Sequence, residues 1–148
     1  MNDEYFMREA LLEAQKAYLM GEVPVGAVAV YNGKIIARAH NLKETANNPT
    51  SHAEIILIDK VSKILNTWYL TDVDIYVTLE PCLMCSGAAL QARIRKLVFG
   101  ARDTKFGAVR SLYNVLDDKR TNHSIEIVEG ICAQESAELL RNFFRERR

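Results

Sequence analysis

The sequence predicts an α/β protein that forms one domain over residues 1–148. After residue 25, segments predicted as β-strands alternate with segments in which apolar residues recur at helical spacing. This order of elements is typical of α/β proteins. The length of 148 residues matches the usual size of a single domain. Apolar residues make up 49% of the chain, which excludes a disordered protein. No repeat, linker or low-complexity segment divides the chain.

The first expected elements are an amphipathic helix and a β-hairpin. Apolar residues recur at helical spacing over residues 3–19, where Asp3 is placed to cap the helix and Gly21 to end it. Asn32-Gly33 lies between two β-prone runs, and this dipeptide is a strong indicator of a tight hairpin turn. The expected strands are 26–31 and 34–39.

The rest of the chain alternates between strands and helices. Residues 40–51 are polar, contain Pro49 and three asparagines, and are expected to form a loop. Pro81 follows a predicted strand, and proline favours the first position of a helix. A long loop is expected over 103–110, around Gly107. The further expected strands are 74–78, 96–100 and 124–128, and the expected helices are 52–65, 81–92, 111–116 and 133–147.

The composition narrows the range of partners. Lys and Arg total 19, and Asp and Glu also total 19, so the formal charge is zero and a uniformly basic nucleic-acid coat is excluded. A nucleic-acid partner would need a local basic patch, an aromatic contact or a shaped pocket. Short apolar runs and the acidic start Met1-Asn2-Asp3-Glu4 predict a soluble, cytoplasmic protein without a membrane partner.

The cysteines favour metal binding over a disulfide framework, because their number is odd and two of the three are three residues apart. Cys82 and Cys85 would share one face of a helix that follows Pro81, where the helix N-terminus favours thiolates. Paired thiolates favour zinc. With His52 as a third ligand, the fourth tetrahedral position stays open, as in catalytic zinc sites.

Glu54 follows His52 by two residues, so the two side chains point to different sides of a regular helix. A metal held by His52 must therefore lie off the helix end, where Glu54 could take a proton from the metal-bound water. Either pattern alone is ambiguous: Cys-x-x-Cys could be a redox pair or half of a structural zinc site, and His-x-Glu occurs by chance. Together, with no fourth Cys or His nearby in the sequence, they match the signature of zinc-dependent base deaminases.

Longer motifs across nearly the whole chain resemble those of the bacterial tRNA adenosine deaminases. The resemblance implies a three-layer α/β/α cytidine-deaminase-like fold with a mixed sheet of about five strands. It also implies a homodimer that converts adenosine to inosine at the first anticodon (wobble) position of a tRNA, with an arginine tRNA as the expected partner. The motifs are Gly21-Glu-Val-Pro-Val-Gly-Ala27, Ala39-His-Asn41, Pro49-Thr-Ser-His-Ala-Glu54, Tyr76-Val-Thr-Leu-Glu-Pro-Cys-Leu-Met-Cys85, Phe99-Gly-Ala-Arg-Asp103, Asn122-His123 and Phe143-Phe-Arg145.

The same resemblance assigns roles to particular residues. It implies that one Zn²⁺ per subunit is bound by three ligands, namely His52, Cys82 and Cys85. Glu54 is then the proton shuttle while zinc-activated hydroxide attacks C6 of adenine. Asn41 holds the flipped base, and its amide offers both a donor and an acceptor to a purine edge. The other expected substrate contacts are Val25 against the base, Asp103 and Lys105 in a loop along the RNA, and Phe144 and Arg145 in the last helix.

Two other functions fit part of the pattern. The metal signature alone does not name the base, so the first alternative is a zinc deaminase of a free base or small nucleotide, of the guanine or cytosine type. The second alternative is a zinc-stabilised RNA-binding subunit without catalysis. Glu54 argues against it, because a structural zinc site has no use for a carboxylate beside an open position.

Overall fold

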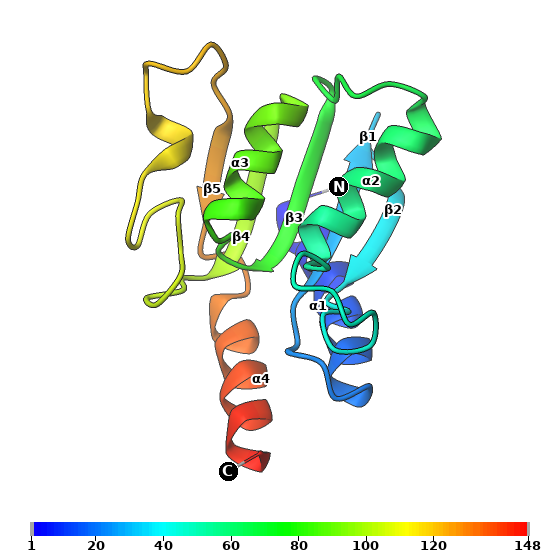
Figure 1. Cartoon of the computed structure of the whole chain (residues 1–148), viewed down its shortest axis with the longest axis vertical. Helices are drawn as coiled ribbons and strands as arrows, with labels where there is room; N and C mark the ends of the chain where they lie inside the picture. The colour runs from blue at the N-terminus through cyan, green and yellow to red at the C-terminus, as the bar shows by residue number, and fades with distance from the viewer. Residues whose placement is uncertain (1, 148) are drawn as a thin grey trace.

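The computed structural model of the chain, described over residues 2–147, contains a mixed five-stranded sheet between two layers of helices (Figure 1). The strand order is β2-β1-β3-β4-β5, with β1 antiparallel to both neighbours and β3, β4 and β5 parallel. The expected α/β fold with about five strands is confirmed. The elements are α1 (Asp3–Leu19), β1 (Gly26–Tyr31), β2 (Lys34–His40), α2 (Ala53–Leu65), β3 (Val73–Leu79), α3 (Leu83–Ala92), β4 (Lys96–Ala101), the 3-10 helix η1 (Val115–Asp117), β5 (Glu126–Glu129) and α4 (Ala133–Glu146).

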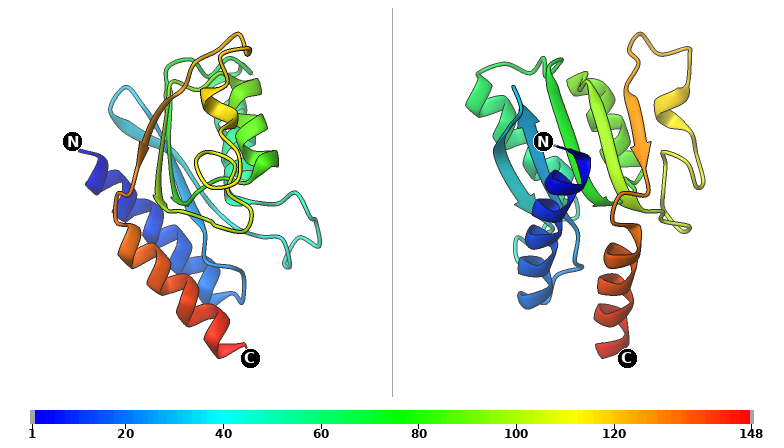
Figure 2. Two further views of the ribbon diagram at one scale, coloured as in Figure 1. Left: turned by 90° about the vertical axis from the view of Figure 1, so that its left-hand side faces the viewer. Right: turned by 180° about the vertical axis from the view of Figure 1, so that it is seen from behind.

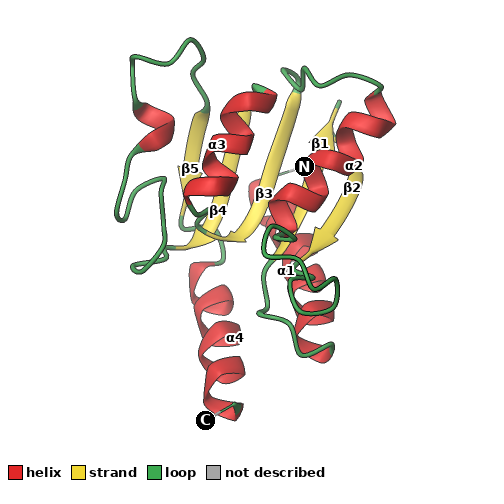
Figure 3. Ribbon diagram, viewed as in Figure 1, coloured by secondary structure: helices red, strands yellow, loops and turns green. Residues whose placement is uncertain are grey.

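Helices cover both faces of the sheet. α2 and α3 lie on one face, and α1 and α4 lie on the other (Figures 2 and 3). The structure has two hydrophobic cores, one on each face of the sheet, and the side chains of β1 alternate between them. Ala27 and Ala29 face α2 and α3, whereas Val28 and Val30 face α1. Strands buried on both faces read as continuous apolar runs, and β1 does so. Among residues 2–147, none of the helices has the length and apolar content that a bilayer span requires.

Asn2, and not Asp3, caps α1, because its side chain accepts a hydrogen bond from the backbone N–H of Tyr5 at 2.9 Å. The prediction of Asp3 as the cap was therefore wrong. The Asp3 carboxylate instead accepts hydrogen bonds from the Tyr76 hydroxyl at 2.5 Å and from Lys96 at 3.1 Å. Asp3 thus joins the helix to β3 and β4.

The two predicted turns near the start of the chain are confirmed. Gly21 follows the end of α1 with a φ of 79°, in the left-handed region that ends many helices. Asn32 and Gly33 connect β1 to β2 with φ values of 52° and 76°. Positive φ at both central residues defines a type I′ turn, whose twist matches that of the two strands.

Pro81 does not start a helix, so that prediction was also wrong. Cys82 is the N-cap of α3, and the first helical residue is Leu83. The carbonyl of Pro81 accepts a hydrogen bond from the N–H of Ala108, at 2.9 Å. Pro81 is therefore tied to the loop after β4 rather than to the helix.

The helix expected over 111–116 does not form, and the described residues there contain only the short 3-10 helix at Val115–Asp117. The reason lies in the backbone hydrogen bonds of the segment. The N–H of Ser111 donates to the Glu80 carboxylate at 2.9 Å, and the N–H of Leu112 donates to a carbonyl of the preceding loop. These two donors would also be free at the start of a helix, but the N–H of Val115, which a helix from residue 111 would direct to the carbonyl of Ser111, donates instead to the carbonyl of Ala108 at 3.1 Å.

The close approach of α1 to β1 gives a testable prediction. A Cβ at Gly26 would collide with the carbonyl oxygen of Ala10 and the backbone of Ala14. We expect Gly26→Ala to lower the free energy of unfolding by about 1–3 kcal/mol through overpacking, as measured by urea denaturation. Gly87→Ala in α3 is the matched control, because a Cβ there meets nothing within 4 Å. The control should leave stability unchanged or raise it by up to about 1 kcal/mol; equal losses in both variants would contradict the packing.

Candidate active site

Strand β1 starts and the other four strands end at one edge of the sheet, and predicted site residues lie in the segments next to these strand ends. Gly26 at the start of β1 lies opposite His40 at the end of β2, and Leu79 at the end of β3 pairs with Ala101 at the end of β4. A hydrogen bond from the Gly26 N–H to the Thr78 hydroxyl, 3.1 Å long, joins the start of β1 to the end of β3. The chain leaves or enters this edge beside Val25, Asn41, Cys82 and Asp103.

Three potential metal ligands lie at the N-termini of α2 and α3, which run side by side on one face of the sheet (Figure 1). His52 immediately precedes α2, Cys82 immediately precedes α3, and Cys85 lies in the first turn of α3. Neither His52 nor Cys82 makes a capping hydrogen bond with its side chain. Both side chains are therefore available to face a shared point.

The ligand atoms of His52, Cys82 and Cys85 lie within 4.8 Å of one another. His52 Nδ1 is 3.7 Å from Cys82 Sγ and 3.5 Å from Cys85 Sγ. Tetrahedral zinc with its usual bond lengths separates a nitrogen and a sulfur ligand by about 3.6 Å. One imidazole and two thiolates are also a donor set that favours zinc. The residues therefore fit this ion in both distance and chemistry.

The three ligand groups share protons among themselves. The pKa of Cys82 falls to about 4, because the Cys85 thiol donates a hydrogen bond to it and His52 adds a second, although burial opposes the change. The same hydrogen bond, together with burial, raises the pKa of Cys85. The hydrogen bond to Cys82 likewise raises the pKa of His52. A bound cation would displace these protons, as metal binding to thiols and imidazoles generally does.

Glu54 lies in the first turn of α2, and its side chain is buried, with 6% exposure. Burial raises its pKa to about 7, and the charge of Cys82 acts in the same direction. A carboxyl group that titrates near neutral pH can both accept and return a proton. The fold thus places a proton-carrying group beside the three potential ligands.

Asn41 and Val25 border the same edge of the sheet. The Asn41 amide donates to the carbonyl of Val23 at 3.4 Å and accepts from the N–H of Lys43 at 3.2 Å, and the residue is 7% exposed. Each end of an amide can make a second hydrogen bond, so Asn41 keeps a donor and an acceptor for a ligand. Val25 is 9% exposed and packs in the core under α2 and α3. Their roles as base contacts stay predictions.

Sequence reasoning missed Glu22, a buried carboxylate just after α1. It accepts hydrogen bonds from the N–H groups of Glu44 at 3.0 Å and Thr45 at 2.5 Å. Burial raises the pKa of Glu22, but these hydrogen bonds outweigh burial and hold the pKa below its usual value. Glu22 therefore fixes the loop that carries Asn41. No local pattern marks this role, because the partners lie 22 and 23 residues further along the chain.

Glu80 has the same role for the loop over residues 103–111, and it too was missed. It follows β3 directly and is 2% exposed. Burial raises its pKa, but the hydrogen bonds that it accepts lower the pKa below its usual value. The feature that could have found it is an acid between a buried strand and Pro81. The donors are the N–H groups of Asp103 (3.0 Å), Val109 (3.0 Å), Arg110 (2.7 Å) and Ser111 (2.9 Å) and the hydroxyl of Ser111 (2.5 Å).

Lys105, Phe144 and Arg145, which the sequence predicts as RNA contacts, line one surface groove of about 400 Å³. Phe144 in this groove is 52% exposed, whereas its neighbour Phe143 is buried against α1. Cations beside an exposed aromatic ring suit single-stranded RNA, whose bases stack on such rings. The lining residues are Lys105, Leu140, Arg141, Phe144 and Arg145.

Asp103 does not line this groove. Its carboxylate accepts hydrogen bonds from the N–H groups of Lys105 at 3.0 Å and Phe106 at 3.1 Å. Hydrogen bonds to an aspartate carboxylate from the N–H groups two and three residues later are typical of an aspartate that starts a tight turn. Asp103 therefore shapes the loop that presents Lys105, and its contact with RNA stays a prediction.

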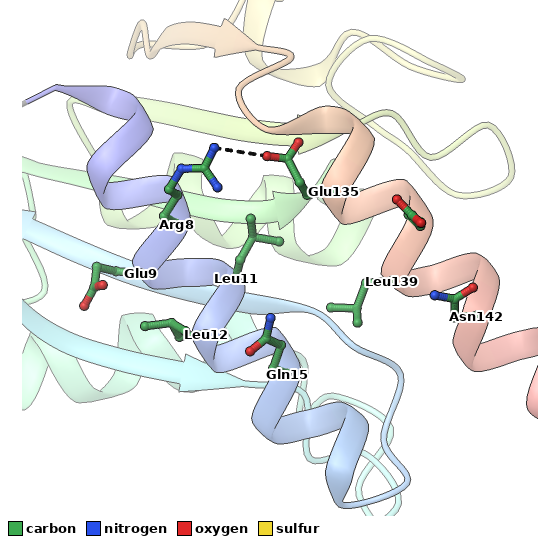
Figure 4. Close-up of a pocket in the computed structure, with 9 residues that line it drawn as sticks. Arg8, Glu9, Leu11, Leu12, Gln15, Glu135, Leu139 and Asn142 are labelled. Carbon is green, nitrogen blue, oxygen red and sulfur yellow. Dashed lines mark hydrogen bonds and ion pairs between the residues drawn. The ribbon is translucent and has the colours of Figure 1, made fainter.

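A second groove, of about 450 Å³, lies between α1 and α4 on the sheet face opposite to α2 and α3 (Figure 4). Leu11, Leu12 and Leu139 contribute apolar surface to it, and an ion pair of 3.2 Å between Arg8 and Glu135 joins the two helices. The groove contains none of the predicted site residues. Its size therefore does not mark it as the active site.

The fold and the group of three potential metal ligands together match the signature of zinc-dependent deaminases. The model of the MafB19-like deaminase family matches residues 1–148. A guanine deaminase from Nitrosomonas europaea has the same fold, with a TM-score of 0.83 at 23% sequence identity over 95% of this chain and 83% of that chain.

Closer relatives narrow the family. The chain is 51% identical over 146 residues to a tRNA-specific adenosine deaminase of Bacillus subtilis (strain 168), covering 99% of this chain and 91% of the relative. It is 47% identical over 148 residues to that of Aquifex aeolicus (strain VF5), covering 100% and 97%. A structure from studies of A-to-I editing by tRNA:A34 deaminases at the wobble position of transfer RNA superposes with a TM-score of 0.88 at 43% identity, over 92% of this chain and 99% of that chain. The chain belongs to the family of tRNA-specific adenosine deaminases.

The lowered pKa of Glu22 predicts how its contribution to stability depends on pH. A carboxyl group with a lower pKa in the folded state stabilises the fold above its unfolded pKa, and this contribution is lost as the pH falls through the folded pKa. At pH 7 we expect Glu22→Gln to lower the free energy of unfolding by about 1–3 kcal/mol. The difference from the parent should shrink below about pH 4.

Urea denaturation at several pH values measures this effect. Glu44→Gln is the matched control, because the Glu44 side chain is exposed and only its backbone N–H contacts Glu22. A Glu22→Gln difference that is constant from pH 7 to pH 3 would show that the charge of Glu22 does not hold the loop.

Proposed function

We propose that this chain catalyses the hydrolytic deamination of adenosine to inosine at the first anticodon (wobble) position of a tRNA. The observation that carries the proposal is the meeting of His52, Cys82 and Cys85 beside the buried carboxyl group of Glu54. Membership of the family supports the choice of substrate, because the relatives are named as tRNA-specific adenosine deaminases. Adenosine and water give inosine and ammonia.

We expect His52, Cys82 and Cys85 to hold one Zn²⁺ per chain. Zinc, when bound, lowers the pKa of a water molecule toward neutrality and so supplies the nucleophile. The chain's contribution is a set of three ligands on two rigid helix ends. This set has one ligand fewer than the four protein ligands typical of structural zinc sites.

Glu54 carries the proton through the reaction. Its carboxylate accepts a proton from the attacking water and delivers it to N1 of adenine. It then takes the proton of the hydroxyl group now on C6 and gives it to the amine, which leaves as ammonia while C6 becomes the carbonyl of inosine. Burial raises the pKa of this carboxyl group above its usual value, which favours a group that can both accept and release a proton. Its burial also keeps bulk water away from the transfer.

The remaining residues bind and orient the substrate. Asn41 offers a donor and an acceptor to the edge of the flipped adenine, and Val25 supplies an apolar wall for its face. Lys105, Phe144 and Arg145 bind the anticodon loop in their shared groove, and Asp103 is the further expected contact. We expect an arginine tRNA as the substrate, a homodimer as the assembly, and a single domain as the folding unit.

The zinc site is tested by metal analysis of purified variants. The parent should contain about one zinc ion per chain, and Cys85→Ala should lose most of it, because two protein ligands hold zinc poorly. Cys132→Ala is the matched control, because Cys132 lies at the start of α4, outside the ligand group. Equal zinc contents in Cys85→Ala and in the parent would contradict the assignment.

The proposed activity is tested with an arginine tRNA anticodon stem-loop that carries adenosine at the first anticodon position. The parent should form inosine, detected by mass spectrometry, and Glu54→Gln should be slower by about 10²- to 10⁴-fold with unchanged zinc content. Equal rates in the variant and the parent would rule out the role of Glu54. Deamination of free guanine or cytosine by the parent, with no inosine in the stem-loop, would instead support the free-base alternative.

A further inference from the structure

Glu80 lies where the metal-binding helix, the end of β3 and the 103–111 loop meet. Its five hydrogen bonds come from both ends of the loop: the N–H of Asp103 at one end, and the N–H groups of Val109, Arg110 and Ser111 with the Ser111 hydroxyl at the other. All of these donors are neutral. A buried carboxylate with neutral donors fixes their directions, because each N–H that loses its acceptor inside the protein is left unsatisfied.

The loop that Glu80 holds is in direct contact with the metal-binding segment. Gly107 forms a β-bridge with Cys82, and the N–H of Ala108 donates to the carbonyl of Pro81 at 2.9 Å. Gly107 also lies so close to the Glu80 carboxyl group that a Cβ at this position would collide with it. The loop can therefore keep this path beside Cys82 only while the Glu80 side chain holds its position.

The same loop carries Lys105 into the groove that contains Phe144 and Arg145. Lys105 lies between the two ends of the loop that Glu80 joins. The position of Lys105 relative to α4 thus depends on the hydrogen bonds that Glu80 accepts. Glu80 does not line the groove itself.

We propose that Glu80 is a positioning residue: its carboxylate fixes the 103–111 loop between the metal-binding Cys82 and the groove of Lys105, Phe144 and Arg145, and so sets the affinity for tRNA. This inference rests on the function proposed above. Glu80 acts through the loop: it is not one of the three potential metal ligands, and it does not line the groove. Its side-chain hydrogen bonds go to the loop and to none of the three potential metal ligands, so we expect its effect in substrate binding.

The variant Glu80→Gln tests the positioning role of Glu80 most directly. The amide keeps the size of the side chain but replaces one acceptor oxygen with a donor, which then faces N–H groups of the loop. Hydrogen exchange followed by mass spectrometry should be at least about tenfold faster for the amides of residues 109–111. Glu22→Gln is the matched control: it should speed exchange at Glu44 and Thr45 and leave residues 109–111 unchanged.

Kinetics on the anticodon stem-loop separate positioning from a general structural effect. We expect Glu80→Gln to raise KM about tenfold, to change kcat less than about threefold, and to keep the zinc content of the parent. Ser111→Ala removes a single hydrogen bond to Glu80 from a partly exposed residue. It should change exchange and KM in the same direction by a smaller factor, and it serves as the second variant if Glu80→Gln fails to fold.

Three results would overturn the inference: unchanged exchange at residues 109–111, faster exchange across the whole chain to the same degree, or a fall in kcat and zinc content at constant KM. A parent that is inactive on the stem-loop would contradict the proposed function instead. The exchange measurement does not depend on activity, so it would still decide whether Glu80 holds the loop.

Discussion

The register of the mixed sheet is the constraint on which the site depends. Because β1 is antiparallel to β2 and β3 while β3, β4 and β5 are parallel, one sheet edge receives the start of β1 and the ends of the other four strands. The packing of α2 and α3 side by side on one face then brings His52 and Cys82 to that edge. A slip of one residue in β3 would exchange its two faces and move Cys82 away from His52.

Two buried carboxylates near this edge are stabilised by N–H donors. Glu22 and Glu80 each bury a carboxylate that binds backbone N–H groups of a loop, so the cost of desolvation is offset by hydrogen bonds. The two loops carry Asn41 and Lys105, two of the proposed substrate contacts. The guanine deaminase with the same fold shows that the sheet and helices alone do not select the base.

Features that depend on near neighbours in the chain could be predicted from the sequence. Asn32-Gly33 specified a hairpin because its turn type needs positive φ at both residues, and the spacing of Cys82 and Cys85 placed the two sulfur atoms in one group of potential metal ligands. The errors came from competition by distant partners. The Asp3 side chain binds Tyr76 and Lys96 instead of capping its helix, and the N–H of Val115 binds the carbonyl of Ala108 instead of that of Ser111. The roles of Glu22 and Glu80 were missed for the same reason.

Zinc K-edge X-ray absorption on the purified parent tests the central claim, an open metal site with three protein ligands, most directly. We expect two sulfur ligands at about 2.3 Å and one imidazole nitrogen at about 2.0 Å from the chain, with the remaining position filled from outside the chain. Three or four sulfur ligands, or a second imidazole, would mean a closed structural site. That result would contradict the proposed catalysis.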